Sequence, residues 1–125
     1  MARRKRTKVP EVVVGRWRIV EMDNWDLDAI DLLGPGYIEF RANGTGEFAI
    51  VAVNGEMDCR PEQHDGRDGV GFSWEGDDEY DPVSGRGWVV ATDDGVLQGR
   101  LYFHFGDESG FRAVPFDSAA AEEQH

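Results

Sequence analysis

The stretch that decides the fold is residues 11–22, EVVVGRWRIVEM. Its three consecutive valines are β-branched and stiff at χ1, so they favour a pleated strand over a helix. After them apolar and polar side chains alternate, with Trp17 and Ile19 on one face and Arg16 and Arg18 on the other. That period of two is typical of a sheet with one wet face. The stretch therefore predicts an amino-terminal β-strand.

The length and composition of the chain indicate one all-β domain. A chain of 125 residues and 14.0 kDa can bury enough surface for a single hydrophobic core. Its 16 glycines and its Asn-Gly and Asp-Gly pairs are typical of strands joined by tight turns. We assign the domain to residues 10–117, with a disordered basic tail at residues 1–9 and a flexible tail at residues 118–125.

Alternation and turn residues divide the domain into eight predicted strands. They cover residues 11–22, 37–41, 47–53, 57–60, 70–74, 88–90, 97–105 and 110–116. Residues 23–33 change to a helical period, which predicts one short helix between the first two strands. A turn is expected at Asn54-Gly55, and polar loops at residues 61–69 and 75–81. Because an open meander exposes its edges, we predict a closed antiparallel up-and-down barrel, with a β-sandwich as the alternative.

Gly15, Arg16 and Trp17 form a Gly-x-Trp motif on the first predicted strand. This motif resembles the signature of the calycin superfamily, which contains lipocalins, fatty-acid-binding proteins and avidins. The resemblance implies that Trp17 closes one end of the barrel and that Arg112, in the last strand, packs across its ring. It also implies a helical lid at the barrel end, as in fatty-acid-binding proteins. The whole chain further resembles short bacterial proteins of unassigned function, and this second resemblance implies no activity.

The charge is divided unevenly along the chain. Residues 1–8 contain five basic side chains, Arg3, Arg4, Lys5, Arg6 and Lys8. Residues 9–125 contain eight arginines, no lysine and all 25 carboxylates, a formal charge of −17. A body with this charge repels a phosphate backbone, so we expect no nucleic-acid binding and a solubilising role for the tail. The same charge favours a basic protein partner.

Three features bear on the compartment. No apolar segment follows the basic start, so residues 1–8 are not expected to be a signal peptide. No run of 18 apolar residues suggests a membrane span. Cys59 is the single cysteine, so no internal disulfide is expected. We therefore expect a cytoplasmic protein without membrane contact, as a monomer or a homodimer.

The aromatic residues of the strands suggest a ligand site inside the barrel. An eight-stranded barrel is just wide enough for its own side chains or for one small ligand. Rings with a few polar groups would suit a small apolar or aromatic molecule. The predicted ligand-binding residues are Trp17, Phe40, Trp74, Trp88, Tyr102 and Phe103. The alternative is an interior filled by these same rings.

The segment at residues 75–81 holds the densest charge in the chain. Its candidate ligands for Ca²⁺ or Mg²⁺ are Asp77, Asp78, Glu79 and Asp81. Their spacing does not match an EF-hand, so no cofactor is expected and a divalent cation is the alternative. We also consider that Arg86 pairs with Asp77 or Asp81 and pins this segment across the barrel mouth.

No set of residues has the spacing of a known catalytic site. His104 with Asp107 or Glu108 is the best candidate acid–base pair, and alternation places His104 outside the barrel. Cys59 is interpreted as a small buried apolar residue rather than as a nucleophile. We therefore expect no catalytic residues.

Three hypotheses for the function follow. The first is a non-enzymatic barrel that holds a small apolar or aromatic ligand. The second is an acidic protein-interaction or inhibitor module with a solid core, whose association with a basic partner weakens with salt. The third is a small barrel enzyme that uses His104 or an interior carboxylate.

Overall fold

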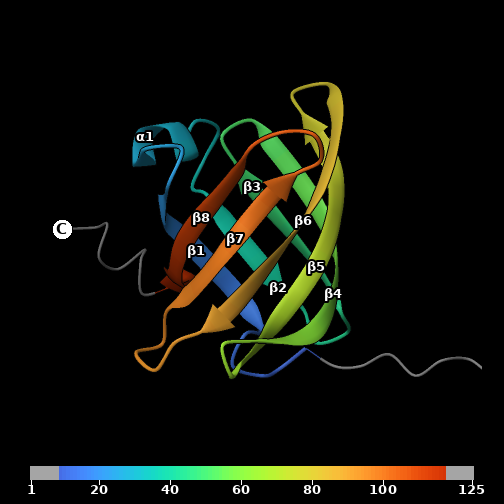
Figure 1. The fold of residues 1–125 in the computed structure, drawn as a ribbon. Helices are drawn as coiled ribbons and strands as arrows, with labels where there is room; N and C mark the ends of the chain where they lie inside the picture. Colours follow the sequence, from blue (N-terminus) through green and yellow to red (C-terminus); the bar gives the residue numbers. More distant parts are fainter. Residues whose placement is uncertain (1–8, 118–125) are drawn as a thin grey trace, which may run out of the picture.

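The computed structural model describes residues 9–117, which form a closed barrel of eight antiparallel strands in chain order (Figure 1). The elements are β1 (Gly15–Met22), α1 (Leu27–Ile30), β2 (Tyr37–Phe40), β3 (Thr45–Ile50), β4 (Val53–His64), β5 (Arg67–Asp78), β6 (Asp81–Ala91), β7 (Leu97–Phe103) and β8 (Glu108–Pro115). β8 returns to pair with β1 and closes the sheet. The predicted fold class is confirmed, including the short helix between β1 and β2. Both predicted tails lie outside the described residues except for Val9, which is buried in the core.

The first strand begins later than predicted. Residues 11–13 form a turn in which the Val13 N–H donates to the Pro10 carbonyl over 2.9 Å. Gly15 then adopts a φ of 133°, which favours glycine, and β1 starts there. The turn sends the buried Val13 side chain into the core, and the Trp17 indole N–H donates to the Val13 carbonyl over 2.9 Å. The valine run therefore precedes the first strand instead of extending it, and only Val13 of the three valines is buried.

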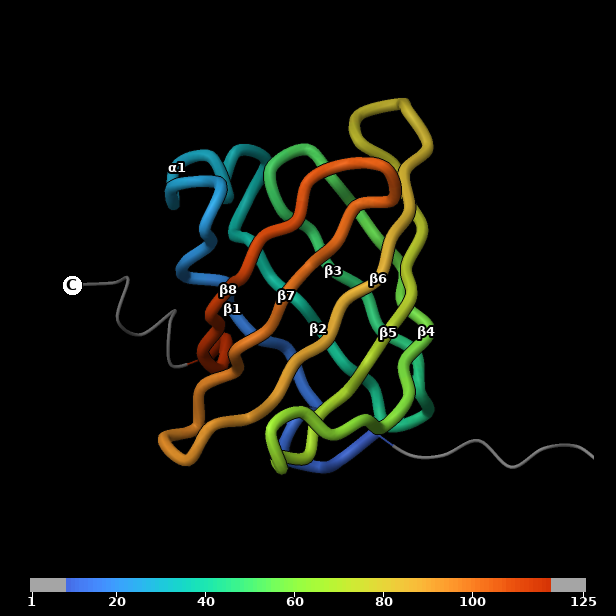
Figure 2. Tube along the Cα trace, viewed as in Figure 1, coloured from blue at the N-terminus to red at the C-terminus, as the bar shows by residue number. Residues whose placement is uncertain are grey.

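The predicted Asn54-Gly55 turn is wrong, because both residues lie within β4. The chain reverses instead at Val51 and Ala52, where Val51 has a φ of 54°. The loop predicted at residues 61–69 is also wrong, because β4 and β5 run through it to a tight turn at Asp65-Gly66. Likewise the acidic segment is the end of a hairpin, in which β5 reaches Asp78 and β6 starts at Asp81. Figure 2 shows this hairpin projecting beyond the neighbouring turns.

Aromatic rings fill the space next to inward-facing glycines. A Cβ placed on Gly55 would lie 2.5 Å from the Phe48 ring, and one on Gly87 would lie 2.5 Å from the Phe72 ring. The Trp74 ring meets the Phe48 ring edge-on, with their centroids 4.9 Å apart. These ring side chains are almost fully buried, so the space between opposite walls of the barrel is filled at these positions by the protein's own rings. This packing favours the filled interior over the hollow one.

A buried ion pair attaches the segment after α1 to the barrel wall. Arg18 lies on the outer side of β1, but only 4% of its side chain is exposed. Its guanidinium donates to both carboxylate oxygens of Asp31, over 2.8 and 2.6 Å, and to the carbonyls of Ile19 and Gly36. The predicted wet position of Arg18 is thus wrong, because residues 31–36 cover it. Such bidentate pairs combine strength with fixed geometry.

The packing at Gly55 gives a test of the filled interior. Gly55→Ala should lower the free energy of unfolding by about 1–3 kcal/mol, because its methyl group overlaps the Phe48 ring. Urea unfolding measures the change. The double variant Gly55→Ala/Phe48→Leu should lose less stability than the sum of the losses in the two single variants, since both substitutions act on the same space. Unchanged stability in Gly55→Ala would mean that the interior has room to spare.

The Arg18–Asp31 pair predicts a loss of stability in Asp31→Asn. We expect a decrease of about 2 kcal/mol, because the buried guanidinium loses the charge of Asp31 but keeps the two carbonyl acceptors of Ile19 and Gly36. Asp28→Asn is the matched control, because Asp28 is exposed on the neighbouring helix. Equal effects of the two variants in urea unfolding would contradict the role of the pair.

The same variant has a pH signature. Burial opposes ionisation of Asp31, but hydrogen bonds from Arg18 and from the Gly36 N–H outweigh it, so the pKa of Asp31 lies below its ordinary value. A lowered folded-state pKa stabilises the protein above the unfolded pKa and loses this effect as the pH falls. The difference between wild type and Asp31→Asn should therefore be full above about pH 5 and shrink below about pH 4.

Candidate functional site

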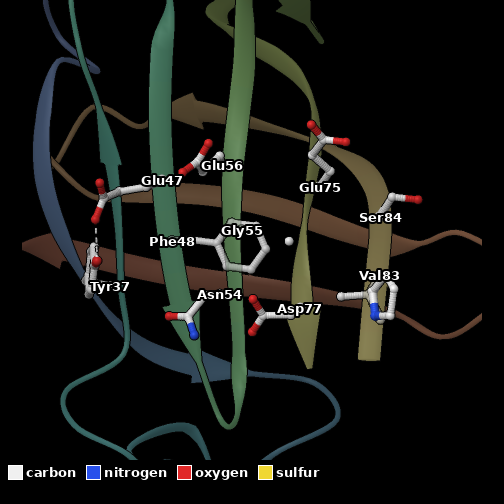
Figure 3. A pocket seen from close by; sticks show the side chains of 12 residues that line it. Tyr37, Glu47, Phe48, Asn54, Gly55, Glu56, Glu75, Asp77, Val83 and Ser84 are labelled. Atoms are coloured by element: carbon white, nitrogen blue, oxygen red, sulfur yellow. Dashed lines mark hydrogen bonds between the residues drawn. The ribbon is translucent and has the colours of Figure 1, made fainter. Parts of the chain in front are cut away.

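Four glutamates form a continuous row across the outer face of the barrel. Glu39 on β2 lies opposite Glu47 on β3, Glu47 opposite Glu56 on β4, and Glu56 opposite Glu75 on β5. Directly opposed side chains have Cβ atoms about 4.5–5.5 Å apart, and like charges at that distance destabilise a sheet. Figure 3 shows Glu47, Glu56 and Glu75 on neighbouring strands, with Asn54 and Asp77 in the next row.

Cations and a phenol compensate one half of this row. Arg16 Nε donates to Glu39 over 2.8 Å, and Arg41 bridges Glu39 and Glu47 over 3.2 and 2.5 Å. The Tyr37 hydroxyl donates to the second oxygen of Glu47 over 2.5 Å. Hydrogen bonds from Tyr37 and Arg41 hold the pKa of Glu47 below its ordinary value. Burial and the Glu47 carboxylate in turn raise the pKa of Tyr37.

The other half of the row has no counter-charge in the described part of the chain. Within residues 9–117, Glu56 and Glu75 make no ion pair and no side-chain hydrogen bond, and both are exposed. They border a hollow of ≈ 630 Å³ that also holds Asp77. Phe48, Gly55 and Gly76 also line it, at a part of the wall where the two glycines are paired. The result is a concave, anionic surface whose floor is backbone at the two glycines.

The six predicted ligand-binding residues do not converge on one site. Trp17, Phe40 and Trp74 are buried inside, and Phe103 packs at their edge, 5.1 Å from Trp74 between ring centroids. Trp88 and Tyr102 instead alternate with the buried Val89 and Leu101, so they lie on the outer face. Trp88 stacks on His64 with centroids 4.3 Å apart, and Tyr102 lies under Arg86.

Arg112 and Trp17 are not brought together. Trp17 lies opposite Pro115 in the β1–β8 register, whereas Arg112 lies opposite Glu21 and donates to it over 3.1 Å. A bulge between Ile19 and Glu21 separates these two positions. Arg112 therefore points outward, while Trp17 points into the core and bonds to the Val13 carbonyl.

The candidate metal ligands lie on a turn and on two faces of a hairpin. Asp78 is opposite Asp81, Asp77 is opposite Pro82, and Glu79 occupies the turn with a φ of 60°. Across residues 9–117, no three carboxylate, imidazole or thiol groups come close enough to hold a metal ion. Arg86 does not pair with Asp77 or Asp81, because the register places it opposite Ser73, away from the hairpin tip.

Within residues 9–117, the catalytic candidate His104 makes no side-chain hydrogen bond or ion pair with Asp107 or Glu108. His104 is exposed and its ring contacts Phe105, while Glu108 is bound to Arg100 over 2.8 Å. The alternation that places His104 outside would turn its neighbour Phe105 inward, yet Phe105 is 98% exposed, because β7 ends at Phe103 and Phe105 adopts a φ of 60°. Cys59 is buried, in the environment predicted for it.

Comparison of the chain with family models, with curated proteins and with solved structures gives no match. In the described part of the chain, no helix is long and apolar enough to cross a membrane. The glutamate row was missed by the sequence reasoning, because its members are 8, 9 and 19 positions apart and meet only through the strand register.

Uncompensated repulsion in the glutamate row predicts stabilising substitutions. Glu56→Gln and Glu75→Gln should each raise the free energy of unfolding by about 0.5 kcal/mol, because each removes one of two opposed charges. Added salt should reduce the gain through screening. Glu39→Gln is the control: it removes the same charge from a residue held by two arginines and should not stabilise. Lower stability in both test variants would refute the repulsion.

Proposed function

We propose that the protein is a non-catalytic binding module whose outer face over β3–β6 receives a cationic segment of a protein partner. The observation that carries the proposal is the opposed pair of Glu56 and Glu75, which has no counter-charge in residues 9–117. A bound lysine or arginine would remove repulsion that the folded protein otherwise retains. Binding and relief of strain would therefore occur together.

The hollow beside this pair fits such a segment. Asp77 adds a third carboxylate, while Asn54 and Ser84 offer neutral hydrogen-bonding groups at its sides. Gly55 and Gly76 carry no side chains, so an aliphatic stem can lie close to the strand backbone between Glu56, Glu75 and Asp77. The formal charge of −17 outside the amino-terminal tail would also steer a basic partner toward the domain.

The interior packing supports this function over a carrier of an internal ligand. Rings occupy the space next to Gly55, Gly87 and Gly99, so an apolar molecule would have to displace them. Strand number, strand order and the helix position are consistent with a calycin-like barrel, and we propose that relationship for the architecture alone. The expectation of a ligand in the lumen stays a prediction.

A charge-reducing double variant tests the proposed function. The probe is a fluorescent peptide composed of alternating lysine, arginine and glycine, titrated into the full chain at several salt concentrations. We expect Glu56→Gln/Glu75→Gln to weaken binding about tenfold or more, the loss of one or two charge-assisted contacts. Affinity for the wild type should fall steeply with added salt.

The control carries the same change of net charge elsewhere. Asp28 and Asp65 are exposed, lie on α1 and on the β4–β5 turn, and have no ion pair in the described structure. Asp28→Asn/Asp65→Asn should leave the affinity within about twofold of wild type, because screened distant charges contribute little. Equal weakening by the two double variants would reduce the effect to net charge and refute a defined site.

A further inference from the structure

Arg86 is the exception among the arginines of the domain. The other seven in residues 9–117 each form an ion pair: Arg16–Glu39, Arg18–Asp31, Arg41–Glu47, Arg60–Asp58, Arg67–Asp93, Arg100–Glu108 and Arg112–Glu21. Within the same residues, the Arg86 side chain makes neither an ion pair nor a hydrogen bond. Because the chain has 25 carboxylate side chains, the lack of a carboxylate partner for Arg86 within residues 9–117 calls for a physical reason.

The strand register supplies that reason. Arg86 on β6 lies opposite Ser73 on β5 and opposite Tyr102 on β7, and neither neighbour carries a charge. The carboxylate at the end of the same row, Glu108, is bound to Arg100. The Arg86 guanidinium instead lies over the Tyr102 ring, with Cζ 4.2 Å from the ring centroid. A cation–π contact uses the face of the guanidinium and leaves the N–H groups at its edge available.

The surroundings of Arg86 are concave and partly aromatic. A hollow of ≈ 460 Å³ on the outer face is lined by Arg86, Ser73, Tyr102 and Trp88. Gly71 on β5 lies opposite Trp88, and the Glu62 carboxylate occupies the space where a Gly71 side chain would stand. Arg60 and Glu62 also line the hollow. The far side of the hollow is closed by His64, whose ring stacks on Trp88 and whose Nε2 is bound to Glu62 over 2.6 Å.

We propose that this hollow binds a small planar organic oxyanion, a carboxylate or a phosphate attached to an aromatic ring. The edge of the Arg86 guanidinium matches a carboxylate or phosphate with two parallel N–H donors, and the Ser73 hydroxyl supplies a third. The aromatic ring of the ligand would lie against Trp88 on β6 and Tyr102 on β7, which both line the hollow. One face of each is already covered, by His64 and by Arg86 respectively. The site has the opposite charge preference to the glutamate row and does not depend on the proposed function.

A titration followed by NMR tests the proposal with benzoate and phenyl phosphate as probes. Both should produce saturable shifts of the Trp88 indole N–H and the Arg86 Nε–H in the full chain. Benzamide has the same ring without the charge and should produce none. Inorganic phosphate should bind more weakly than phenyl phosphate, and equal affinities would overturn the role assigned to the ring.

Variants at two arginines separate a defined site from general charge. Arg86→Gln should weaken benzoate binding about tenfold or more, and Arg86→Lys should give an intermediate loss because it keeps the charge without the paired donors. Arg67→Gln removes the same charge at the β4–β5 hairpin end, outside the hollow, and should bind as wild type does. Absence of saturable shifts, or equal losses in Arg86→Gln and Arg67→Gln, would overturn the proposal. A native-like spectrum of Arg86→Gln establishes that its loss is not unfolding.

Discussion

Closure of the sheet between β1 and β8 is the constraint on which the rest of this structure depends. A closed eight-stranded barrel has an interior about as wide as the side chains that point into it. Inward glycines face large rings here, as at Gly55 with Phe48 and at Gly87 with Phe72, and the wall keeps its shape because ring and glycine share one space. With the interior occupied in this way, both of the sites that we propose lie on the outer surface.

The outer surface is organised by strand register rather than by neighbours in the sequence. Each strand places every second residue outside, and antiparallel pairing lines these residues up in rows around the barrel. One row brings together Glu39, Glu47, Glu56 and Glu75, and the adjacent row places Arg86 between Ser73 and Tyr102. The row of glutamates and Arg86, which has no carboxylate partner within residues 9–117, therefore lie on neighbouring rows of the same sheet. The two sites that we propose therefore arise from one pattern of alternation.

The fold could be predicted because its main signals are local. Alternation around Trp17 and along β7 defines strands, and eight of them in meander order favour closure. The predicted turn at Asn54-Gly55 was wrong because glycine serves two purposes. It is typical of turns, but here the missing side chain of Gly55 makes room for the Phe48 ring inside a strand. The proposed outer sites could not be predicted, because they depend on the register between strands, which the sequence does not show. A shift of one residue in that register would turn the side chains of a strand to the other face and separate Glu56 from Glu75. Arg112 illustrates the same limit, since a bulge in β1 sets its partner as Glu21.

The pairing of β1 with β8 also has a consequence for how the protein is made. Trp17 meets Pro115 and Arg18 meets Val114, so the last seam of the barrel joins the two ends of the domain. During translation β1 leaves the ribosome first and must wait, with one edge unpaired, until almost the whole domain has been synthesised. Hairpins such as β4–β5 join residues that are close in sequence and can form early, whereas the final seam carries the full entropy of closing a long loop. The nascent chain therefore has an open sheet until its last strand emerges, which is the period when a chaperone would protect it.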